Sequence, residues 1–316
     1  MRILITGVGG FAGSHLADHL LDQNQHEVWG VVIAPPRPEY LDRRVRLVTA
    51  DLSVPAEVTD LLAKIRPDRI YHLAGQAFPP LSWTDPWDTL RNNIRSQLNI
   101  LHTCVQLDML ETRVLAVGSA DEYGRLTPDN LPAREDAPFR PDSPYAVSKI
   151  AQDFLGQSYF LSHHLPVVRV RPFHHIGPRQ NRQFVTPDFA HQIISIERGE
   201  RPPVVRVGNL QAERDFTDVR DIVRGYAAAL EHGQPGEVYN VASGLARSVR
   251  SILDGLLAHA DRPMAVEVDP TRMRPSDTPR QQGDASKLRA ATGWQPVIPF
   301  EQSLKDVLDY ERQHYK

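Results

Sequence analysis

The chain has 316 residues, and its 36 Lys and Arg against 39 Asp and Glu give a formal net charge of −3. This near-neutral balance excludes non-specific binding to nucleic acid or anionic membranes as the function. Hydrophobic residues make up 41% and charged residues 24%, which excludes the disordered and fibrous classes. The one cysteine, Cys104, excludes an internal disulfide and a cysteine-based zinc site, so we expect no metal and a reducing compartment.

The cellular location is also constrained by hydropathy. Residues 1–7 reach a glycine-rich stretch before the apolar core of a signal peptide has formed. No run of 18 apolar residues occurs, so no transmembrane helix is expected. We therefore expect a cytoplasmic protein.

Short apolar runs predict strands in the first half of the chain, at residues 3–6, 27–33, 45–50, 69–74, 114–119 and 167–173. Amphipathic helical patterns lie between most of them. The pattern over 14–23 places Leu16, Ala17, Leu20 and Leu21 on one face, and the patterns at 88–107 and 143–163 are long enough to cross over a sheet. This alternation predicts an α/β fold with a Rossmann-type, doubly wound parallel sheet.

The amino-acid composition changes after Phe173, where proline becomes frequent. We expect a smaller C-terminal α/β region there. Its predicted helices span 187–198, 218–231, 248–260 and 300–313. We expect a dinucleotide-binding domain over 1–173, with returning segments near 215–243, and a second domain mainly over 174–316. The loop 124–144 contains five prolines and is expected at the surface beside a cleft.

The segment Gly7-Val8-Gly9-Gly10-Phe11-Ala12-Gly13 follows a predicted strand and opens a helix, as a dinucleotide-binding loop does. Gly7 permits the tight turn, Gly10 lets backbone N–H groups approach a pyrophosphate, and Gly13 lets the helix pack close to the strand. The helix N-terminus adds partial positive charge. A tight turn without a ligand is the alternative. The cofactor-binding residues expected here are Gly7, Gly10, Phe11, Ala12 and Gly13.

The sequence specifies less clearly whether the ribose of the cofactor carries a 2′-phosphate. A carboxylate that would hold the ribose 2′-hydroxyl is expected near 31–33, at the end of the second strand, and none is present. Its absence favours NADP(H), with Arg37 near enough in sequence to reach a 2′-phosphate, and NAD(H) stays possible. Asp51 and Leu52, after the third strand, are expected to contact the adenine, while Asp51 is also a candidate cap for the following helix.

Tyr145 and Lys149 are spaced i, i+4, so a helix starting near Ser143 and Pro144 presents both from one face. A neighbouring ammonium stabilises phenolate, and we expect Lys149 to lower the pKa of Tyr145 and make it a usable acid or base. Ser119, at the end of a strand, is placed to orient a substrate carbonyl. The alternatives to a catalytic role are that Tyr145 is a buried ring, that Lys149 is a solvated lysine and that Ser119 is a cap at the end of the strand.

Four further segments match the landmarks of one family. They are His72-Leu73-Ala74-Gly75, Asn92-Asn93-Ile94, Arg171-Pro172-Phe173 and Thr292-Gly293-Trp294-Gln295-Pro296. With the glycine loop, Ser119 and the Tyr145/Lys149 pair, the chain resembles an extended short-chain dehydrogenase/reductase of the nucleotide-sugar epimerase/dehydratase type. The resemblance implies a cofactor site that includes Leu73 and Ala74, a C-terminal domain for the nucleotide sugar, and a homodimer formed through a four-helix bundle.

Within that family, the segment 208–219, which contains Arg214, resembles the GDP-mannose branch of 4,6-dehydratases and GDP-4-keto-6-deoxy-mannose reductases. The resemblance implies that Arg214 and Arg274 grip the substrate diphosphate, which needs charge-assisted donors on leaving water. The alternative is that these arginines form surface ion pairs with Asp215 and Asp277. His174 stands where the reductase pattern has Asn, and we expect it in the substrate site.

The segment after Ser119 bears on the reaction. Dehydratases need an additional carboxylate base, and some use an Asp-Glu pair directly after the hydroxyl residue, where this chain has Ala120 and Asp121. The shorter Asp121 disfavours dehydration, because general acid–base catalysis tolerates little misplacement. Asp121 is still expected to contact the substrate.

The sequence therefore predicts an oxidoreductase of deoxysugar biosynthesis. We expect NADPH-dependent reduction of the C4 ketone of a GDP-4-keto-6-deoxyhexose to a product such as GDP-rhamnose. Tyr145 would protonate the oxygen, Lys149 would hold the nicotinamide ribose, and Ser119 would orient the carbonyl. A nucleotide-sugar 4-epimerase, a GDP-mannose 4,6-dehydratase and a non-catalytic NADP(H)-sensing regulator stay as alternatives.

Overall fold

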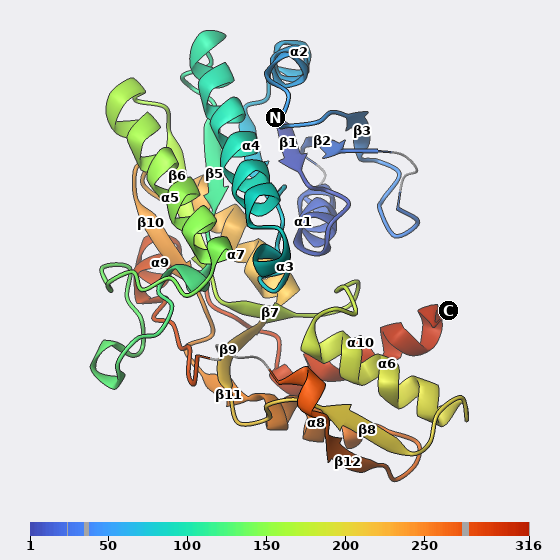
Figure 1. Ribbon diagram of the computed structural model, residues 1–316. Helices are drawn as coiled ribbons and strands as arrows, with labels where there is room; N and C mark the ends of the chain where they lie inside the picture. Colours follow the sequence, from blue (N-terminus) through green and yellow to red (C-terminus); the bar gives the residue numbers. More distant parts are fainter. Residues whose placement is uncertain (24, 35–37, 274–277, 316) are drawn as a thin grey trace.

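The structure is a computed structural model and describes residues 1–23, 25–34, 38–273 and 278–315 (Figure 1). Its main sheet has seven parallel strands in the order β10-β6-β5-β4-β1-β2-β3. They are β1 (Arg2–Thr6), β2 (Glu27–Val32), β3 (Arg46–Thr49), β4 (Arg69–His72), β5 (Arg113–Val117), β6 (Val167–Pro172) and β10 (Val238–Val241). The predicted Rossmann-type parallel sheet is confirmed, and every predicted strand forms, with its end at or slightly before the expected residue.

Helices cover both faces of this sheet. The helices on one face are α2 (Pro55–Ile65), α4 (Pro86–Gln106) and α5 (Pro144–His163), and those on the other are α1 (Phe11–Asp22), α7 (Val219–His232) and α9 (Ser286–Thr292). Side chains alternate across a strand, so Ile3 and Ile5 pack with α1 and α7, while Leu4 packs with α2 and α4. The continuous apolar run in β1 therefore follows from burial on both faces.

A smaller region lies beyond the carboxyl ends of the main strands (Figure 1). It contains a three-stranded sheet in the order β11-β9-β7 and a two-stranded sheet β12-β8. These elements are β7 (His174–Ile176), β8 (Val204–Val207), β9 (Glu213–Asp218), β11 (Ala246–Ser248), β12 (Ala265–Val268), α6 (Val185–Glu197), α8 (Val249–Leu257) and α10 (Phe300–His314). They share a core of their own, which includes Phe189 and Leu308. No helix in the described ranges is long and apolar enough to span a membrane.

The chain crosses between the two regions more than once. β10 pairs in parallel with β6, so residues 238–241 return to the main sheet after the small sheets have begun. The proline-rich loop 124–144 is held to a later segment, because Ala133 N donates to the Gln282 carbonyl over 2.7 Å. The expected division into a cofactor domain and a nucleotide-sugar domain stays a prediction.

Candidate active site

The glycine loop joins β1 to α1 as its sequence predicts. Gly7 has φ +67°, in the left-handed region, and its carbonyl accepts from Gly10 N over 2.9 Å. A Cβ on Gly13 would lie 2.2 Å from the Gly7 carbonyl oxygen, so only glycine lets the helix start this close to the strand. The first turn of α1 has no side-chain cap, and its N–H groups have no acceptor within the helix. These donors fit a pyrophosphate.

Leu73 and Ala74 lie directly against this loop. Their backbone N–H groups both donate to the Thr6 hydroxyl over 3.1 Å, and a Cβ on Gly7 would lie 2.9 Å from the Ala74 backbone. The ends of β1 and β4 and the glycine loop therefore form one continuous surface, to which Leu73 and Ala74 belong.

At the adenine end of the expected cofactor site, the alternative that Asp51 caps a helix is wrong. Asp51 does not cap a helix, because α2 starts at Pro55 with Val54 before it, and the Asp51 carboxylate accepts from Ser53 N over 2.8 Å. That hydrogen bond lowers the Asp51 pKa. Leu52 is buried beside it. The described residues directly after β2, 33–34, carry no carboxylate, and Arg37 lies outside the described residues.

The expected catalytic residues meet at the carboxyl end of β5. The Ser143 hydroxyl accepts from Ala146 N and starts α5, which buries both Tyr145 and Lys149. Lys149 Nζ lies 5.9 Å from the Tyr145 ring centroid and donates to the Val117 carbonyl over 3.0 Å. The Ser119 hydroxyl accepts from Asp121 N over 3.1 Å and caps the Ala120–Glu122 turn, and its side chain lies close enough to Tyr145 to lower the pKa of the phenol. The three side chains that the sequence singled out thus form one cluster.

The electrostatics of this cluster correct the expected role of the lysine. Burial raises the pKa of Tyr145, and the charges of Asp121 and Glu122 raise it further, while the Ser119 side chain opposes them. Burial also lowers the pKa of Lys149 to about 8. The expectation that Lys149 lowers the phenol pKa is wrong for the protein alone, because desolvation is the largest cause acting on Tyr145 and the Lys149 ammonium is not among the others. Tyr145 is therefore a phenol that holds its proton.

Sequence reasoning missed a buried ionic cluster beneath these residues. Ser119 N donates to Glu122 Oε1 over 2.7 Å, and Arg171 Nε lies 3.0 Å from Glu122 Oε2 and 2.9 Å from Asp153 Oδ2. Burial raises the pKa of Glu122, with the Asp153 charge as the second cause. The cluster fixes the backbone at Ser119. Its sequence signal was the two arginines, Arg169 and Arg171, in the otherwise apolar strand β6, since buried charges need partners.

His72 is part of a family landmark, but the sequence assigned it no role. Its Nδ1 lies 2.9 Å from the Thr6 hydroxyl, and burial, with the charge of Lys149, lowers its pKa to about 3. The ring is therefore neutral and adds no positive charge beside the lysine. A lone histidine in a strand gives no signal of such a position.

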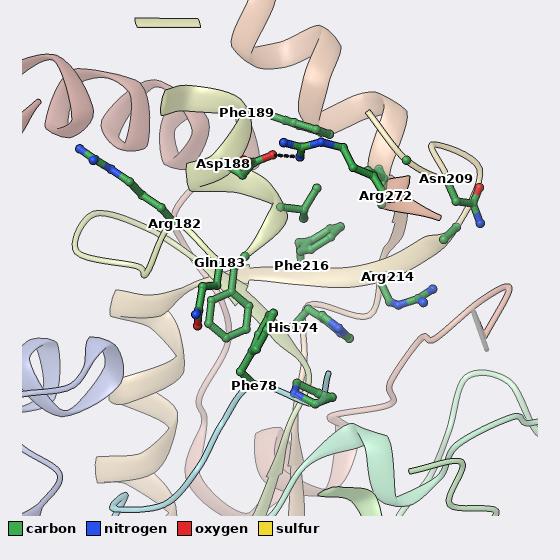
Figure 2. Close-up of a pocket in the computed structure, with 16 residues that line it drawn as sticks. Phe78, His174, Arg182, Gln183, Asp188, Phe189, Asn209, Arg214, Phe216 and Arg272 are labelled. Carbon is green, nitrogen blue, oxygen red and sulfur yellow. Dashed lines mark hydrogen bonds and ion pairs between the residues drawn. The ribbon is translucent and has the colours of Figure 1, made fainter. Parts of the chain in front are cut away.

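A cavity of about 380 Å³ lies between the main sheet and the small region (Figure 2). Its apolar lining includes Phe78, Phe189 and Phe216. The polar side chains around it are His174, Arg182, Gln183, Asp188, Asn209, Arg214 and Arg272. Three arginines around an apolar cavity are suited to a ligand that carries both negative charge and a flat ring.

Arg214 lies on this cavity, as the expected contact to a diphosphate requires. Its Nη1 donates to the carbonyls of Glu213 over 2.8 Å and Thr278 over 2.6 Å. The alternative of an ion pair with Asp215 is wrong, because that buried carboxylate accepts from Ser243 and from the Gly244 and Gly283 N–H groups. Arg274 lies outside the described residues, as does Asp277.

The two adjacent histidines of β7 face different sites. His174 lines the cavity, with its ring centroid 5.8 Å from that of Phe216. His175 stacks on Phe11 of the glycine loop at a centroid distance of 5.6 Å. Successive side chains of a strand point in opposite directions, so β7 connects the two expected binding sites and separates the histidines from each other.

Asp121 lies on the same turn as Ser119 and close enough for its charge to act on Tyr145. Its Oδ1 accepts from Gln281 Nε2 over 3.1 Å. The carboxylate therefore faces the catalytic cluster, with one oxygen bonded to a segment of the C-terminal region.

Comparisons with known proteins give a consistent result. The sequence profile of the family described as GDP-mannose 4,6 dehydratase matches residues 4–307. The chain is 34% identical over 311 residues to GDP-6-deoxy-D-mannose reductase of Pseudomonas aeruginosa, covering 98% of this chain and 97% of the relative. The structure of RMD from Pseudomonas aeruginosa complexed with NADPH is similar, with a TM-score of 0.85, 32% identity and 99% coverage of both chains. The structure of UDP-glucose 4-epimerase from Thermus thermophilus in complex with NAD has a TM-score of 0.88, 28% identity, and 99% and 100% coverage.

Proposed function

The chain belongs to the GDP-mannose 4,6-dehydratase family of extended short-chain dehydrogenase/reductases, which are NAD(P)-dependent nucleotide-sugar enzymes, and from this premise we propose that it is a reductase. The proposed reaction is NADPH-dependent reduction of the C4 ketone of a GDP-4-keto-6-deoxyhexose. The product is a GDP-6-deoxyhexose such as GDP-rhamnose.

The observation that carries this proposal is the cluster of Tyr145, Ser119 and Lys149 in a chain that is 34% identical, over 98% of its length, to a GDP-6-deoxy-D-mannose reductase. A reduction begins with a group that donates a proton, whereas an epimerase or a dehydratase begins with an oxidation that needs a base. Burial raises the Tyr145 pKa, so the phenol carries a proton at neutral pH. The protonated phenol is able to donate its proton in a reduction, and the preference for a reductase over an epimerase draws on the similarity to GDP-6-deoxy-D-mannose reductase.

Each side chain of the cluster has a role in this reaction. Tyr145 donates its proton to the alkoxide that develops at C4, and the Ser119 hydroxyl orients the carbonyl. Lys149, held by the Val117 carbonyl, binds the nicotinamide ribose through its ammonium. A dihydronicotinamide cofactor bound at the glycine loop supplies the hydride equivalent.

The cavity supports a nucleoside-diphosphate sugar as the substrate. Arg214 offers charge-assisted donors for the diphosphate, and His174 lines the cavity close to β6 and the catalytic end of the sheet. The assignment to GDP-linked sugars also draws on the similarity to GDP-6-deoxy-D-mannose reductase over nearly the full length of both chains.

Dehydration is disfavoured by the surroundings of Asp121. A dehydratase base must reach the C5 proton, and Asp121 is shorter than glutamate and has one oxygen bonded to Gln281. The carboxylate is more suited to hold a substrate hydroxyl.

A direct assay tests the proposal. Purified protein is incubated with GDP-4-keto-6-deoxy-mannose and NADPH, and cofactor oxidation is followed by its absorbance. We expect one NADPH consumed per sugar reduced.

A 4-epimerase is the second candidate because of the structural similarity to UDP-glucose 4-epimerase. Interconversion of a nucleotide sugar without net cofactor consumption would assign the protein to that class instead.

The cofactor preference is proposed to be NADP(H). The described residues directly after β2, 33–34, carry no carboxylate that would repel a 2′-phosphate. Steady-state assays should give a lower KM for NADPH than for NADH. The reverse order would assign NAD(H).

A cytoplasmic location, where reduced nicotinamide and a free thiol such as Cys104 are maintained, is part of the same proposal.

We also propose a homodimer formed by α4 and α5, which pack side by side (Figure 1). The outer face of this helix pair exposes Leu98, Phe154 and Leu161, with Phe154 51% and Leu161 64% exposed. Exposed apolar side chains on two packed helices are typical of an interface. Light scattering after gel filtration should give twice the chain mass, and the double variant F154E/L161E should give a monomer.

A further inference from the structure

The cavity has two different ends. Figure 2 shows Phe78 and His174 at one end, Asp188 and Arg272 at the other, and Phe216 between them. The Phe78 end is connected to α5, the helix that carries Tyr145 and Lys149. Gln76 N, two residues before Phe78, donates to Asn93 Oδ1 over 2.7 Å, and Asn93 Nδ2 donates to the Ser148 hydroxyl of α5 over 2.9 Å. The sugar therefore belongs at the Phe78 end, and the base at the end with Asp188.

We infer that Asp188 and Arg272 together read the nucleotide base and select guanine. This inference rests on the proposed function, since it requires a nucleoside-diphosphate sugar in the cavity. It adds the residues that determine which base is accepted.

The arrangement of donors and acceptors supports guanine. Arg272 Nη1 and Gln192 Nε2 both donate to Asp188 Oδ2, over 2.7 and 2.9 Å, so the pair presents the two lone pairs of Oδ1 followed by a donor nitrogen of Arg272. The Watson–Crick edge of guanine presents the complementary order, with N2–H and N1–H as donors followed by the O6 acceptor. Arginine is also the usual partner of O6. Uracil and thymine place a carbonyl on each side of one N–H, so one of their oxygens would face a carboxylate oxygen.

Both side chains keep the capacity for these bonds. A carboxylate accepts about four hydrogen bonds, and within the described chain the Asp188 side chain accepts two, from Arg272 and from Gln192 Nε2, both on Oδ2. The guanidinium has about five N–H groups, of which one donates to Asp188, while its Nε lies 3.9 Å from Asp269 Oδ2. Oδ1 of Asp188 and the second terminal nitrogen of Arg272 are therefore available to a base.

The surroundings hold this pair in place. Asp188 lies in the first turn of α6, next to the buried Phe189, and Gln192 one turn later fixes the carboxylate. A Cβ on Gly208 would lie 2.5 Å from the Arg272 carbonyl oxygen, so the loop after β8 packs directly on the segment that carries Arg272. Phe189 lines the same end and provides apolar contact for a flat ring.

The variant Asp188→Asn tests the inference, because an amide presents one acceptor and one donor in the same shape. Because Arg272 and Gln192 both donate to the Oδ2 position, the amide oxygen takes that place and the NH2 group faces the base. Xanthine has the acceptor O2 where guanine has its amino group, so it can accept from this NH2 group. Binding of GDP, xanthosine 5′-diphosphate and UDP is measured by calorimetry on the full chain saturated with NADPH. We expect the wild-type protein to prefer GDP, and D188N to bind GDP about 10- to 100-fold more weakly and the xanthine nucleotide more tightly.

Controls separate this effect from damage to the fold. D188N should keep the wild-type affinity for NADPH, and Asp254→Asn, which removes the exposed ion pair with Arg250 on α8, should leave all three affinities unchanged. If the wild-type protein prefers GDP and D188N retains the same ratio of GDP to xanthine affinity, the base is read elsewhere and only this inference fails. If the wild-type protein prefers UDP, the proposed GDP-sugar function itself fails.

Discussion

The glycine loop after β1 and the cavity beside β9 are built in opposite ways. The loop is the single run of residues 7–13, and it offers backbone N–H groups at the start of α1 without a side-chain cap. The cavity offers charged and polar side chains that come from separate segments, including β7, α6, β9 and the 3₁₀ turn Pro270–Arg272. Its three arginines therefore meet only when the chain has folded.

This difference determines how each site tolerates change. Recognition by the backbone fails when a Cβ blocks the close approach, whichever residue brings it. Recognition by a guanidinium fails when that one side chain is lost, while the backbone around it stays folded. Tyr145 belongs to the catalytic cluster, and loss of its hydroxyl should affect neither binding step. Variants in the three places therefore separate catalysis, substrate binding and cofactor binding.

The largest effect is expected from Tyr145→Phe, which removes the proton donor and keeps the ring. General acid catalysis contributes about 10²- to 10⁴-fold, so kcat should fall by about 10³-fold. Dissociation constants for NADPH and for GDP, measured by calorimetry, should change less than about twofold. A variant that retains a tenth of the wild-type kcat would show that another group donates the proton.

Arg214→Ala should have the next largest effect, on the substrate side alone. Loss of charge-assisted hydrogen bonds to a diphosphate should raise KM for the nucleotide sugar by about 10- to 100-fold, with the NADPH affinity unchanged. Arg250→Ala on α8, whose guanidinium pairs with Asp254 at the surface, is the matched control. An unchanged KM for Arg214→Ala would remove this residue from the substrate site.

Gly13→Ala should act on the cofactor side alone. Its Cβ would lie 2.2 Å from the Gly7 carbonyl oxygen, so the loop must shift and the NADPH dissociation constant should rise by about tenfold or more. Gly199→Ala is the control, because its φ of +75° makes alanine strained there while its Cβ would meet nothing within 4 Å, so it shows what backbone strain away from the loop does to cofactor binding. Calorimetry on both variants gives the comparison. Equal effects on cofactor binding would mean that the close approach at Gly13 is unimportant.

The smallest effect is expected from pH. Burial lowers the Lys149 pKa to about 8, so the ammonium is present below that pH and is lost as the pH rises through it. If the charge holds the nicotinamide ribose, kcat/KM for NADPH should fall by about twofold between pH 7 and 8 and continue to fall above it. Lys149→Arg keeps its charge, so its profile should stay flat over this range. A wild-type profile that is flat to about pH 10 would contradict the proposed role.

Local patterns predicted the parts of the molecule that depend on neighbours in sequence. The strand at 3–6, the turn at Gly7 and the helix that presents Tyr145 and Lys149 all formed as expected, because each needs only its own spacing and backbone freedom. The error at Asp51 has the same origin, since a carboxylate before a helix caps it only if the helix begins within a few residues.

Properties that depend on burial were not predictable in this way. Lys149 lies one helical turn from Tyr145, yet the Tyr145 pKa is raised, because the fold buries the ring and brings Asp121 and Glu122 near it. Glu122 and Arg171 are far apart in the chain, and only the packing of the Ala120–Glu122 turn against β6 makes them partners.

The amino-acid sequence by itself determined the α/β class, the glycine turn and the helical spacing of the tyrosine and lysine, because these follow from backbone freedom and from periodic burial along one segment. Tertiary structure alone decided which charges meet. It brought Asp188 and Arg272 together across 84 positions and gave each buried group its proton affinity, since Coulomb and desolvation energies depend on distance in space and on excluded water.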